Sequence, residues 1–419
     1  MKRELGSMEE ALERTDSASP FNVVVCVALS KAPHPDEMKA AFARAVTAHP
    51  ILNVRLVKTG ARSSFTDEDV GPIPFHKLER QGETHWETIV EASLNHRFLA
   101  ETSPPAAITY LYNEDGEADL ILAFRHTIID GTSLIKFLDQ ILSQCAEPAV
   151  STAPATLPPS SDEHIPAQYK SLSSAVTFFG RQMADELKFR LSSKGRKQPA
   201  IPSNGVTSFI ETRLEPELIQ KLSSKARRQR VTMYSTLGAA LLIAANEMSF
   251  HGKSGPVRLV SFHNLRPYLT PPVPDDQLGC HIAMGRSSIV MEDAAQFWDI
   301  AAQTNEKVAD LGRSGEKFMM ARMAIRMTQP MVRFKMMRMG TVALTINDAS
   351  SLATHYAETS VRALHGMVSG QDIAPPFSIA ATIHHDGWRL AFPYIRTEFT
   401  QDDVQAYAAR VRALLEESI

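Results

Sequence analysis

This sequence of 419 residues has few cysteines, no excess of positive charge and no long apolar run. The three cysteines, Cys26, Cys145 and Cys280, are odd in number and far apart, which excludes a disulfide framework and a CxxC metal site. The net charge of −3 argues against a nucleic-acid partner. The longest apolar runs, 21–29 and 237–245, fall short of the roughly 20 residues that a membrane span needs. No apolar leader follows the N-terminal basic residues, so we expect a cytoplasmic protein without a membrane span.

Several catalytic signatures are also missing from the sequence. It contains no GxSxG nucleophile elbow, no Walker A loop, no GxGxxG fingerprint and no HExxH zinc motif. We therefore expect no metal and no tightly bound cofactor. The apolar fraction of 44% is nevertheless high enough for a large buried core.

One stretch of the chain reads as a linker. Residues 147–168 are rich in proline, serine and alanine and show little periodicity, so they divide the chain into units of 1–146 and 169–419. Hydrophobic periodicity predicts strands and helices in both units. The predicted strands cover Ile51 to Val57, Ala106 to Tyr112, Asp119 to Phe124, Thr207 to Leu214 and Val342 to Ile346; the predicted helices cover Pro216 to Arg228, a long region from Ala294 to Met339, and Gln401 to Glu417.

The strongest chemical signal is the heptapeptide that runs from Arg125 to Gly131, Arg-His-Thr-Ile-Ile-Asp-Gly. It places His126 in a loop between a strand and a helix, where pockets collect in α/β folds. Histidine titrates near working pH, so it can take a proton from a nucleophile and return it to a leaving group. The alternative is a solvent-facing histidine followed by Asp130 as an ordinary helix N-cap.

This heptapeptide resembles the His-His-x-x-x-Asp-Gly motif of acyltransferases with the chloramphenicol-acetyltransferase fold, with Arg125 in place of the first histidine. That superfamily includes condensation domains, alcohol acetyltransferases and polyketide-associated (phthiocerol dimycocerosyl transferase-like) acyltransferases. Three further segments are similar to it: Arg3 to Gly6 with Ala48 to Leu52, Val231 to Leu241, and Asn264 to Gly279. The chain most resembles the alcohol-acetyltransferase and polyketide-associated branch.

The resemblance implies an α/β fold of two acetyltransferase-like subdomains that form a pseudo-dimer around a central channel. It makes His126 the catalytic base and assigns Asp130, Gly131 and Arg266 to the support of its loop, with Arg266 paired to Asp130. Asn347 aligns with a family asparagine that could donate a hydrogen bond to an oxyanion, although Ala349 replaces the family's glycine. The alternative for Asn347 is a turn residue after a strand.

A methionine-rich segment from Met319 to Met339 also carries five basic residues. One interpretation is a helix pair with a methionine core face and a solvated basic face. The other is a soft lining for an acyl chain with cations that bind the donor's phosphates. The candidate donor-binding residues are Arg322, Arg326, Arg333, Lys335 and Arg338.

The resemblance predicts an acyltransferase that uses an acyl-CoA or a phosphopantetheinyl thioester of an acyl carrier protein as co-substrate. The acceptor would be a small-molecule alcohol or amine, with O-acyl transfer favoured, and the protein would be a monomer. Two alternatives remain open: a stand-alone condensation enzyme that forms an amide, and a non-catalytic module that recruits a carrier protein. The segment His384 to Gly387 has the same residue types as the motif, but it lacks the three residues between histidine and aspartate, and it is typical of a hairpin turn.

Overall fold

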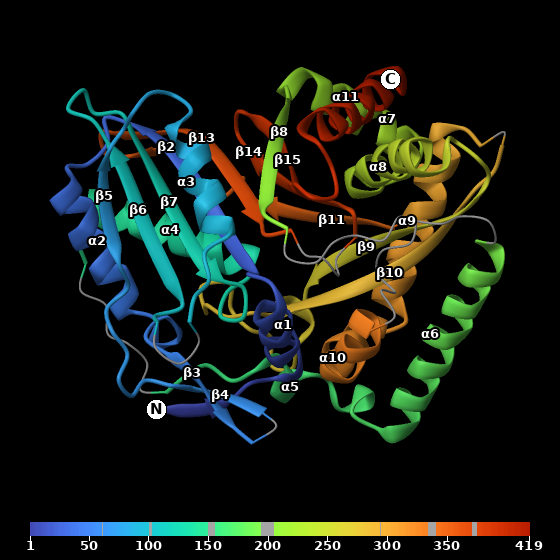
Figure 1. Cartoon of the computed structure of the whole chain (residues 1–419), viewed down its shortest axis with the longest axis horizontal. Coiled ribbons are helices and arrows are strands. Elements are labelled where there is room, and N and C mark those ends of the chain that lie inside the picture. Colours follow the sequence, from blue (N-terminus) through green and yellow to red (C-terminus); the bar gives the residue numbers. More distant parts are fainter. Residues whose placement is uncertain are drawn as a thin grey trace.

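The computed structural model consists of two six-stranded sheets that lie side by side, each covered by helices (Figure 1). It describes residues 1–60, 62–99, 103–149, 156–193, 205–293, 295–333, 341–370 and 375–419. This α/β architecture of two halves is the predicted one. No helix in the described part of the chain combines the length and the apolar character that crossing a lipid bilayer requires.

The first sheet has the strand order β12-β13-β2-β7-β6-β5. Its neighbours are antiparallel except for the parallel pair β5 and β6. Helices α2 (Pro35–Thr47) and α4 (Gly131–Ala146) pack together over one face, and α3 (His85–Leu94) covers the other. The strands are β2 (Asn22–Ser30), β5 (Phe75–Glu79), β6 (Ala106–Tyr112), β7 (Ala118–Arg125), β12 (His355–Tyr356) and β13 (Thr359–Val368).

The second sheet has the strand order β10-β9-β11-β14-β15-β8, in which β11 is parallel to both of its neighbours. Helices α8, α9 and α11 pack against one face and enclose a large apolar core. The strands are β8 (Thr207–Leu214), β9 (Gly255–Asn264), β10 (Ile282–Met291), β11 (Thr341–Asp348), β14 (Phe377–His384) and β15 (Gly387–Ile395); the helices are α7 (Pro216–Arg228), α8 (Met233–Phe250), α9 (Phe297–Arg313) and α11 (Gln401–Glu417).

The remaining elements lie at the centre and at the edges of the molecule. Helix α1 packs against α10 at the centre of the molecule, and α6 stands at its outer edge beside α10 and β9 (Figure 1). A three-stranded sheet in the order β1-β4-β3 lies near the N-terminus. These elements are α1 (Ser7–Ala18), α5 (Ser161–His164), α6 (Leu172–Ser192), α10 (Glu316–Arg333), β1 (Lys2–Glu4), β3 (Arg55–Thr59), β4 (Arg62–Thr66) and the 3-10 turns Pro50–Leu52, Ala167–Tyr169 and Arg266–Tyr268.

Two strand and helix predictions need correction. The predicted strand from Ile51 to Val57 is a 3-10 turn over Pro50–Leu52 followed by β3, because Pro50 fixes a turn conformation at the end of α2. The long helical region after Ala294 is two helices, because Gly315 between them adopts a positive φ of 69° that ends regular helix.

One strand from the C-terminal part of the chain completes the first sheet. β13 pairs with β2 along its length, with Leu364 opposite Val27 and Gly366 opposite Val25. The next strand, β14, returns to the second sheet, where it pairs with β11 and β15. This crossover ties the two halves together and brings β13 and β14 to the seam between them.

Candidate active site

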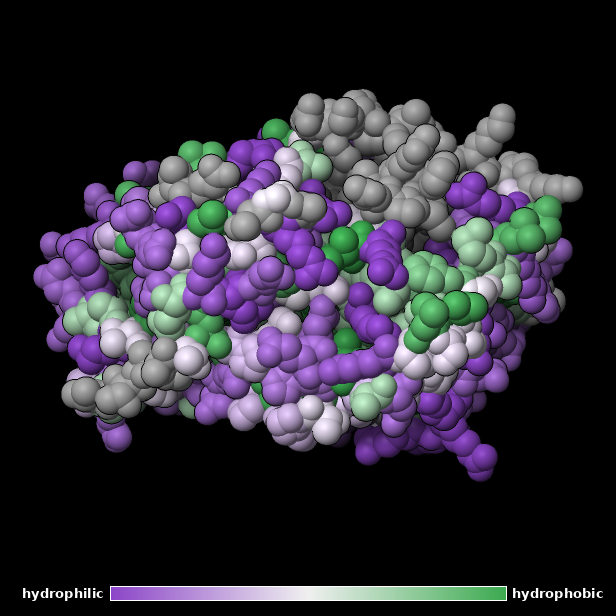
Figure 2. Space-filling view, turned by 90° about the horizontal axis from the view of Figure 1, so that it is seen from below, coloured by the Kyte–Doolittle hydropathy of each residue, from purple (hydrophilic) through white to green (hydrophobic). Residues whose placement is uncertain are grey.

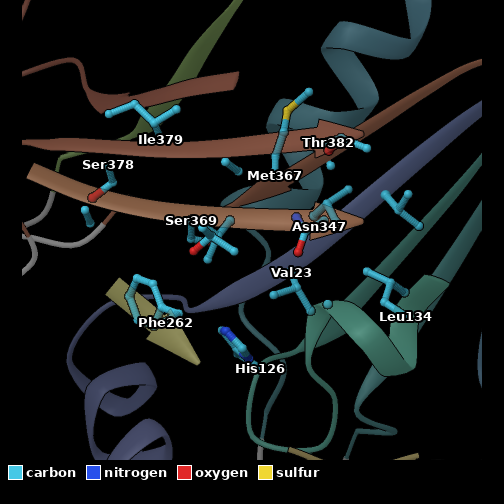
Figure 3. Close-up of a pocket in the computed structure, with 18 of the residues that line it drawn as sticks. Val23, His126, Leu134, Phe262, Asn347, Met367, Ser369, Ser378, Ile379 and Thr382 are labelled. Carbon is cyan, nitrogen blue, oxygen red and sulfur yellow. The ribbon is translucent and has the colours of Figure 1, made fainter. Parts of the chain in front are cut away.

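His126 lies directly after β7, at the seam between the two sheets (Figure 3). Its backbone amide donates to the Phe21 carbonyl at 3.0 Å, which holds the loop to the segment before β2. The ring centroids of His126 and Phe21 lie 5.1 Å apart. The imidazole is therefore positioned by its neighbours and partly shielded from solvent.

The two nitrogens of the His126 ring have different roles. Nδ1 lies 2.9 Å from the carbonyl oxygen of Ile129, and a carbonyl can only accept a hydrogen bond. Nδ1 must therefore carry the proton in the neutral ring, and Nε2 is left with the free lone pair. Burial lowers the pKa of His126 below its ordinary value, so the neutral ring predominates at neutral pH.

A buried ion pair between Asp130 and Arg266 fixes the end of this loop. Arg266 Nη1 donates to Asp130 Oδ2 at 2.7 Å, and both side chains are almost fully buried. The backbone amide of His281 donates to the same oxygen at 2.8 Å, while Asp130 Oδ1 accepts from the Ser133 amide at 2.9 Å and so caps α4. The expected ion pair is present, and it connects the two halves of the molecule.

Ser133 extends this network by a second route. Its hydroxyl lies 2.6 Å from Arg266 Nη2, 3.0 Å from the Gly279 carbonyl and 3.1 Å from the Gly279 amide. Burial alone would raise the pKa of Asp130, but Arg266 and the two backbone amides outweigh it and hold that pKa below its ordinary value. The carboxylate is thus charged and fully occupied, which suits a structural role.

Arg125 replaces the first histidine of the family motif and has a separate set of partners. Its guanidinium is buried and lies 2.7 Å from Glu13 and 2.6 Å from Asp16, both on α1. It also donates to the Phe98 carbonyl at 3.2 Å. Arg125 therefore attaches α1 to the end of β7 and is absent from the residues that line the cavity described next.

A cavity of about 120 Å³ lies against His126, between the two sheets (Figure 3). Strands of both sheets and the first turn of α4 contribute its walls, which are mainly apolar. The side chains with polar atoms are His126, Thr345, Asn347, Ser369, Ser378 and Thr382. The apolar lining includes Phe21, Val23, Val25, Leu134, Ile135, Phe262, Ile282, Ala343, Met367 and Ile379.

The side chain of Asn347 lies on the cavity wall between two glycines. A Cβ atom on Gly131 would overlap with Asn347 Oδ1, and one on Gly366 would lie 3.4 Å from Asn347 Nδ2 and 2.6 Å from Thr382 Oγ1. Asn347 also pairs with Thr382 across β11 and β14. Gly131 is therefore required for space, and its neighbour Asn347 lies at the cavity rather than in a turn after β11.

Only two of the five basic candidates, Arg322 and Arg326, have side chains that the structure describes. Arg322 donates to the carbonyls of Tyr169 and Ser171, and Arg326 is exposed on α10. Neither lines the cavity. The side chain of Arg333 and the whole of Lys335 and Arg338 lie outside the described residues.

The methionines of the described part of α10 belong to a core. Met319, Met320 and Met323 are buried against Ala175 and Phe178 of α6. The interpretation as a methionine core face therefore fits the structure, and none of these three methionines lines the cavity. The segment His384 to Gly387 is the predicted turn between β14 and β15, with Arg389 and His384 bound to Asp386.

Sequence reasoning did not single out Gly366, Thr382, Ser133 and His281. Gly366 and Thr382 lie in ordinary strand patterns, which give no signal that they face a cavity. Ser133 is the third residue of the α4 helix, where a hydroxyl carries no special pattern. Only the Leu278-Gly279 pair, part of the resemblance, marked the segment that contacts Asp130.

Comparison with known proteins supports the superfamily that the sequence resembles. Residues 203–334 match the family model described as phthiocerol/phthiodiolone dimycocerosyl transferase C-terminus. No curated protein matches the sequence. The match lies in the second half of the chain, and it agrees with the resemblance of the motif to the polyketide-associated acyltransferases.

Solved structures show that the fold extends over the whole chain. The trichothecene 15-O-acetyltransferase of Fusarium sporotrichioides superposes with a TM-score of 0.79 at 10% identity, covering 100% of this chain and 95% of its own. The first condensation domain of the calcium-dependent antibiotic synthetase gives 0.75 at 13% identity, with 100% and 96% covered. Polyketide synthase associated protein 5 of Mycobacterium tuberculosis gives 0.67 at 15% identity, with 99% and 98% covered.

Proposed function

We propose that this chain, which has the fold of the chloramphenicol-acetyltransferase and condensation-domain superfamily, transfers an acyl group from a thioester to the hydroxyl of a small molecule. One observation carries the proposal: His126 presents a neutral ring, protonated on Nδ1, at an apolar cavity between the two sheets. A general base needs its proton-free nitrogen beside the reacting hydroxyl. The donor is an acyl-CoA or an acyl carrier protein.

The reaction needs no covalent acyl-enzyme. His126 Nε2 takes the hydroxyl proton as the acceptor oxygen attacks the carbonyl carbon of the thioester, and the carbonyl oxygen becomes an oxyanion. When the oxyanion collapses, the carbon–sulfur bond breaks, and the imidazolium returns the proton to the leaving thiolate. The products are an ester and a free thiol.

Asn347 is the candidate donor to the oxyanion. Its amide lies at the cavity, and the described residues provide no hydrogen-bond partner for it. An amide N–H that is fixed before the reaction stabilises negative charge at low reorganisation cost, especially where apolar walls exclude water. Gly131 and Gly366 leave the space that the amide occupies.

Asp130 and Arg266 affect this reaction by positioning the loop that carries His126. Their ion pair is buried and neither residue lines the cavity. They hold the start of α4, and with it the turn in which the Ile129 carbonyl contacts His126. Loss of the pair would loosen the base and the wall that carries Gly131.

Amide formation is the second candidate, since the chain superposes on a condensation domain with a TM-score of 0.75. The same base could deprotonate an amine in place of an alcohol. Arg125 at the first histidine position, bound to α1, counts against it only weakly. A non-catalytic recruitment module would not require the intact set of His126, Asp130, Gly131 and Arg266.

The test is a matrix of thioester donors and acceptors. The purified chain is incubated with acyl-CoA and acyl-pantetheinyl donors of several lengths and with pools of alcohols and amines. Thiol release is followed with a chromogenic disulfide, and products are identified by mass spectrometry. An ester whose formation requires His126 supports the proposal, an amide supports the second candidate, and the absence of any product throughout the matrix contradicts both.

A further inference from the structure

Helix α6 exposes a row of large apolar side chains on the outside of the molecule. Leu172, Val176, Met183, Leu187 and Leu191 are between 56% and 78% exposed. Their spacing of four, seven, four and four residues places them on one face of the helix. They account for five of the twelve large apolar residues that are exposed in the described part of the chain. We call this row the α6 stripe.

The inward face of α6 explains why the stripe stays outside. The helix has two acidic residues, Asp185 and Glu186, and both turn towards the second sheet. Arg258 lies 2.8 Å from Asp185 and 2.6 Å from Glu186, and Arg286 lies 3.1 Å from Glu186. The guanidinium of Arg258 also lies 3.7 Å from the ring centroid of Phe189.

These contacts fix the rotation of α6 about its own axis. Buried or half-buried ion pairs of this kind cannot exchange with solvent without leaving a charge unpaired. Ala175 and Phe178 pack against the methionines of α10 on the same side. The stripe therefore lies on the face of α6 that points away from the second sheet and from α10.

The charge on the outward side is of one sign. The exposed charged residues of α6 are Arg181, Lys188 and Arg190, all basic, although the whole chain has a net charge of −3. Arg190 also donates to Glu186 at 2.6 Å, which leaves part of its guanidinium facing outward. Two copies of the chain that paired through this helix would bring these cations together. The charge therefore favours an anionic partner over a second copy.

The shape of the surface favours a flat partner. Leu172 and Leu191 are 19 positions apart, so the stripe is about 28 Å long at 1.5 Å per residue. The helix stands at the outer edge of the molecule (Figure 1), and Figure 2 shows hydrophobic residues on the same side, seen from below. A long apolar helix face bordered by basic side chains is the pattern of helices that lie in a bilayer interface.

We infer that the α6 stripe docks this chain on the surface of an anionic lipid bilayer. The apolar side chains enter the boundary between headgroups and acyl chains, and Arg181, Lys188 and Arg190 contact the anionic headgroups. The inference does not depend on the proposed reaction. If both hold, the enzyme meets lipid-soluble substrates where they reside.

The experiment is a flotation assay with the full chain and vesicles. Vesicles of phosphatidylcholine with phosphatidylglycerol are compared with vesicles of phosphatidylcholine alone, at low and high salt. We expect binding to the anionic vesicles that weakens with salt. The variant Val176→Ser/Met183→Gln/Leu187→Gln should bind at least about tenfold more weakly, because three apolar side chains no longer enter the interface.

A control variant, Leu78→Gln/Val206→Ser/Val290→Ser, changes three exposed apolar residues that lie outside α6 and should bind like the wild type. Circular dichroism and thermal unfolding check that both variants are folded. Sedimentation of the wild type without vesicles tests whether a second copy of the chain binds the α6 stripe instead. Failure to float with anionic vesicles overturns the inference, as does a wild-type dimer that the α6 variant makes monomeric, or equal binding by the α6 variant and the wild type.

Discussion

Arg266 Nη1 lies 2.7 Å from Asp130 Oδ2, and this contact joins the loop of the candidate base in one half to the segment after β9 in the other. Both side chains are buried, so neither charge has water as a substitute partner. The ion pair therefore links the two halves of the molecule and also supports the loop that carries His126.

The first prediction concerns the free energy of unfolding. Asp130→Ala removes the partner of a buried arginine and the cap of α4, so we expect a loss of about 3–5 kcal/mol in urea denaturation. Asp130→Asn keeps the cap acceptor and should lose less. A double-mutant cycle with Arg266→Met should show strong coupling. If the two changes have additive effects on the free energy of unfolding, Asp130 and Arg266 are not coupled.

The second prediction tests the base. His126→Ala should lower turnover by about 10²–10⁴-fold, the usual contribution of a positioned general base. The midpoint of thermal unfolding should change little, because one face of the ring borders the cavity. Steady-state kinetics and calorimetry measure the two effects. If the purified His126→Ala variant keeps near-full activity, His126 is not the general base.

The third prediction tests the space beside Asn347. Gly131→Ala places a methyl group on Asn347 Oδ1 and should displace the amide. We expect kcat to fall by about 10²–10³-fold, the effect of losing one oxyanion donor, with a small change in KM. Asn347→Ala should give a similar loss, and the double variant should be no worse than either single one.

Gly312→Ala is the matched control for that substitution. No atom lies within 4 Å of the position of its added Cβ, and it lies within α9, where alanine is favourable. It should leave kcat unchanged and raise the unfolding temperature slightly. If Gly131→Ala leaves kcat at the wild-type level, Asn347 does not act on the reaction.

The fourth prediction concerns the pH dependence of kcat/KM. Burial lowers the pKa of His126 below the ordinary value of about 6.5, so the ring stays neutral at pH values where a free histidine is protonated. The acid limb of kcat/KM should therefore lie below pH 6.5, with one proton taken up by the free enzyme. An acid limb at or above pH 6.5 would contradict this environment for the base.

The fifth prediction concerns stability in acid. Burial and the nearby Arg266 lower the pKa of His281 to about 4, so the unfolded chain binds a proton there that the folded chain does not. The contribution of His281 to stability is therefore complete above about pH 6.5 and is lost as the pH falls towards 4. Denaturant unfolding at several pH values measures it.

The pH dependence of stability is compared between the wild type and the variant His281→Asn, because Glu13 changes stability in the opposite direction. Burial raises the pKa of Glu13 to about 7, so this residue adds stability as the pH falls through the same window. The difference between wild type and variant isolates His281. That difference should depend on pH between about 6.5 and 4, and a constant difference would show that His281 does not stay neutral in the fold.

Much of the local structure follows from the sequence alone. The strand Thr207–Leu214 and the helices Pro216–Arg228 and Gln401–Glu417 have the predicted bounds, because periodicity, Pro216 and the cap at Thr400 define them locally. The His126 motif lies between a strand and a helix as expected. Periodicity does not reveal strand order, however, so it could not predict that β13 pairs with β2 in the first sheet.

The site shows the same division. The sequence alone determined the motif around His126 and, through its resemblance, the pairing of Asp130 with Arg266. Only the tertiary structure decided that Arg125 binds α1 and that Asn347 lies between Gly131 and Gly366. It also decided that α6 turns its acids inward and leaves an apolar stripe outside. These relations join residues up to hundreds of positions apart, and packing between elements, which no local pattern encodes, selects them.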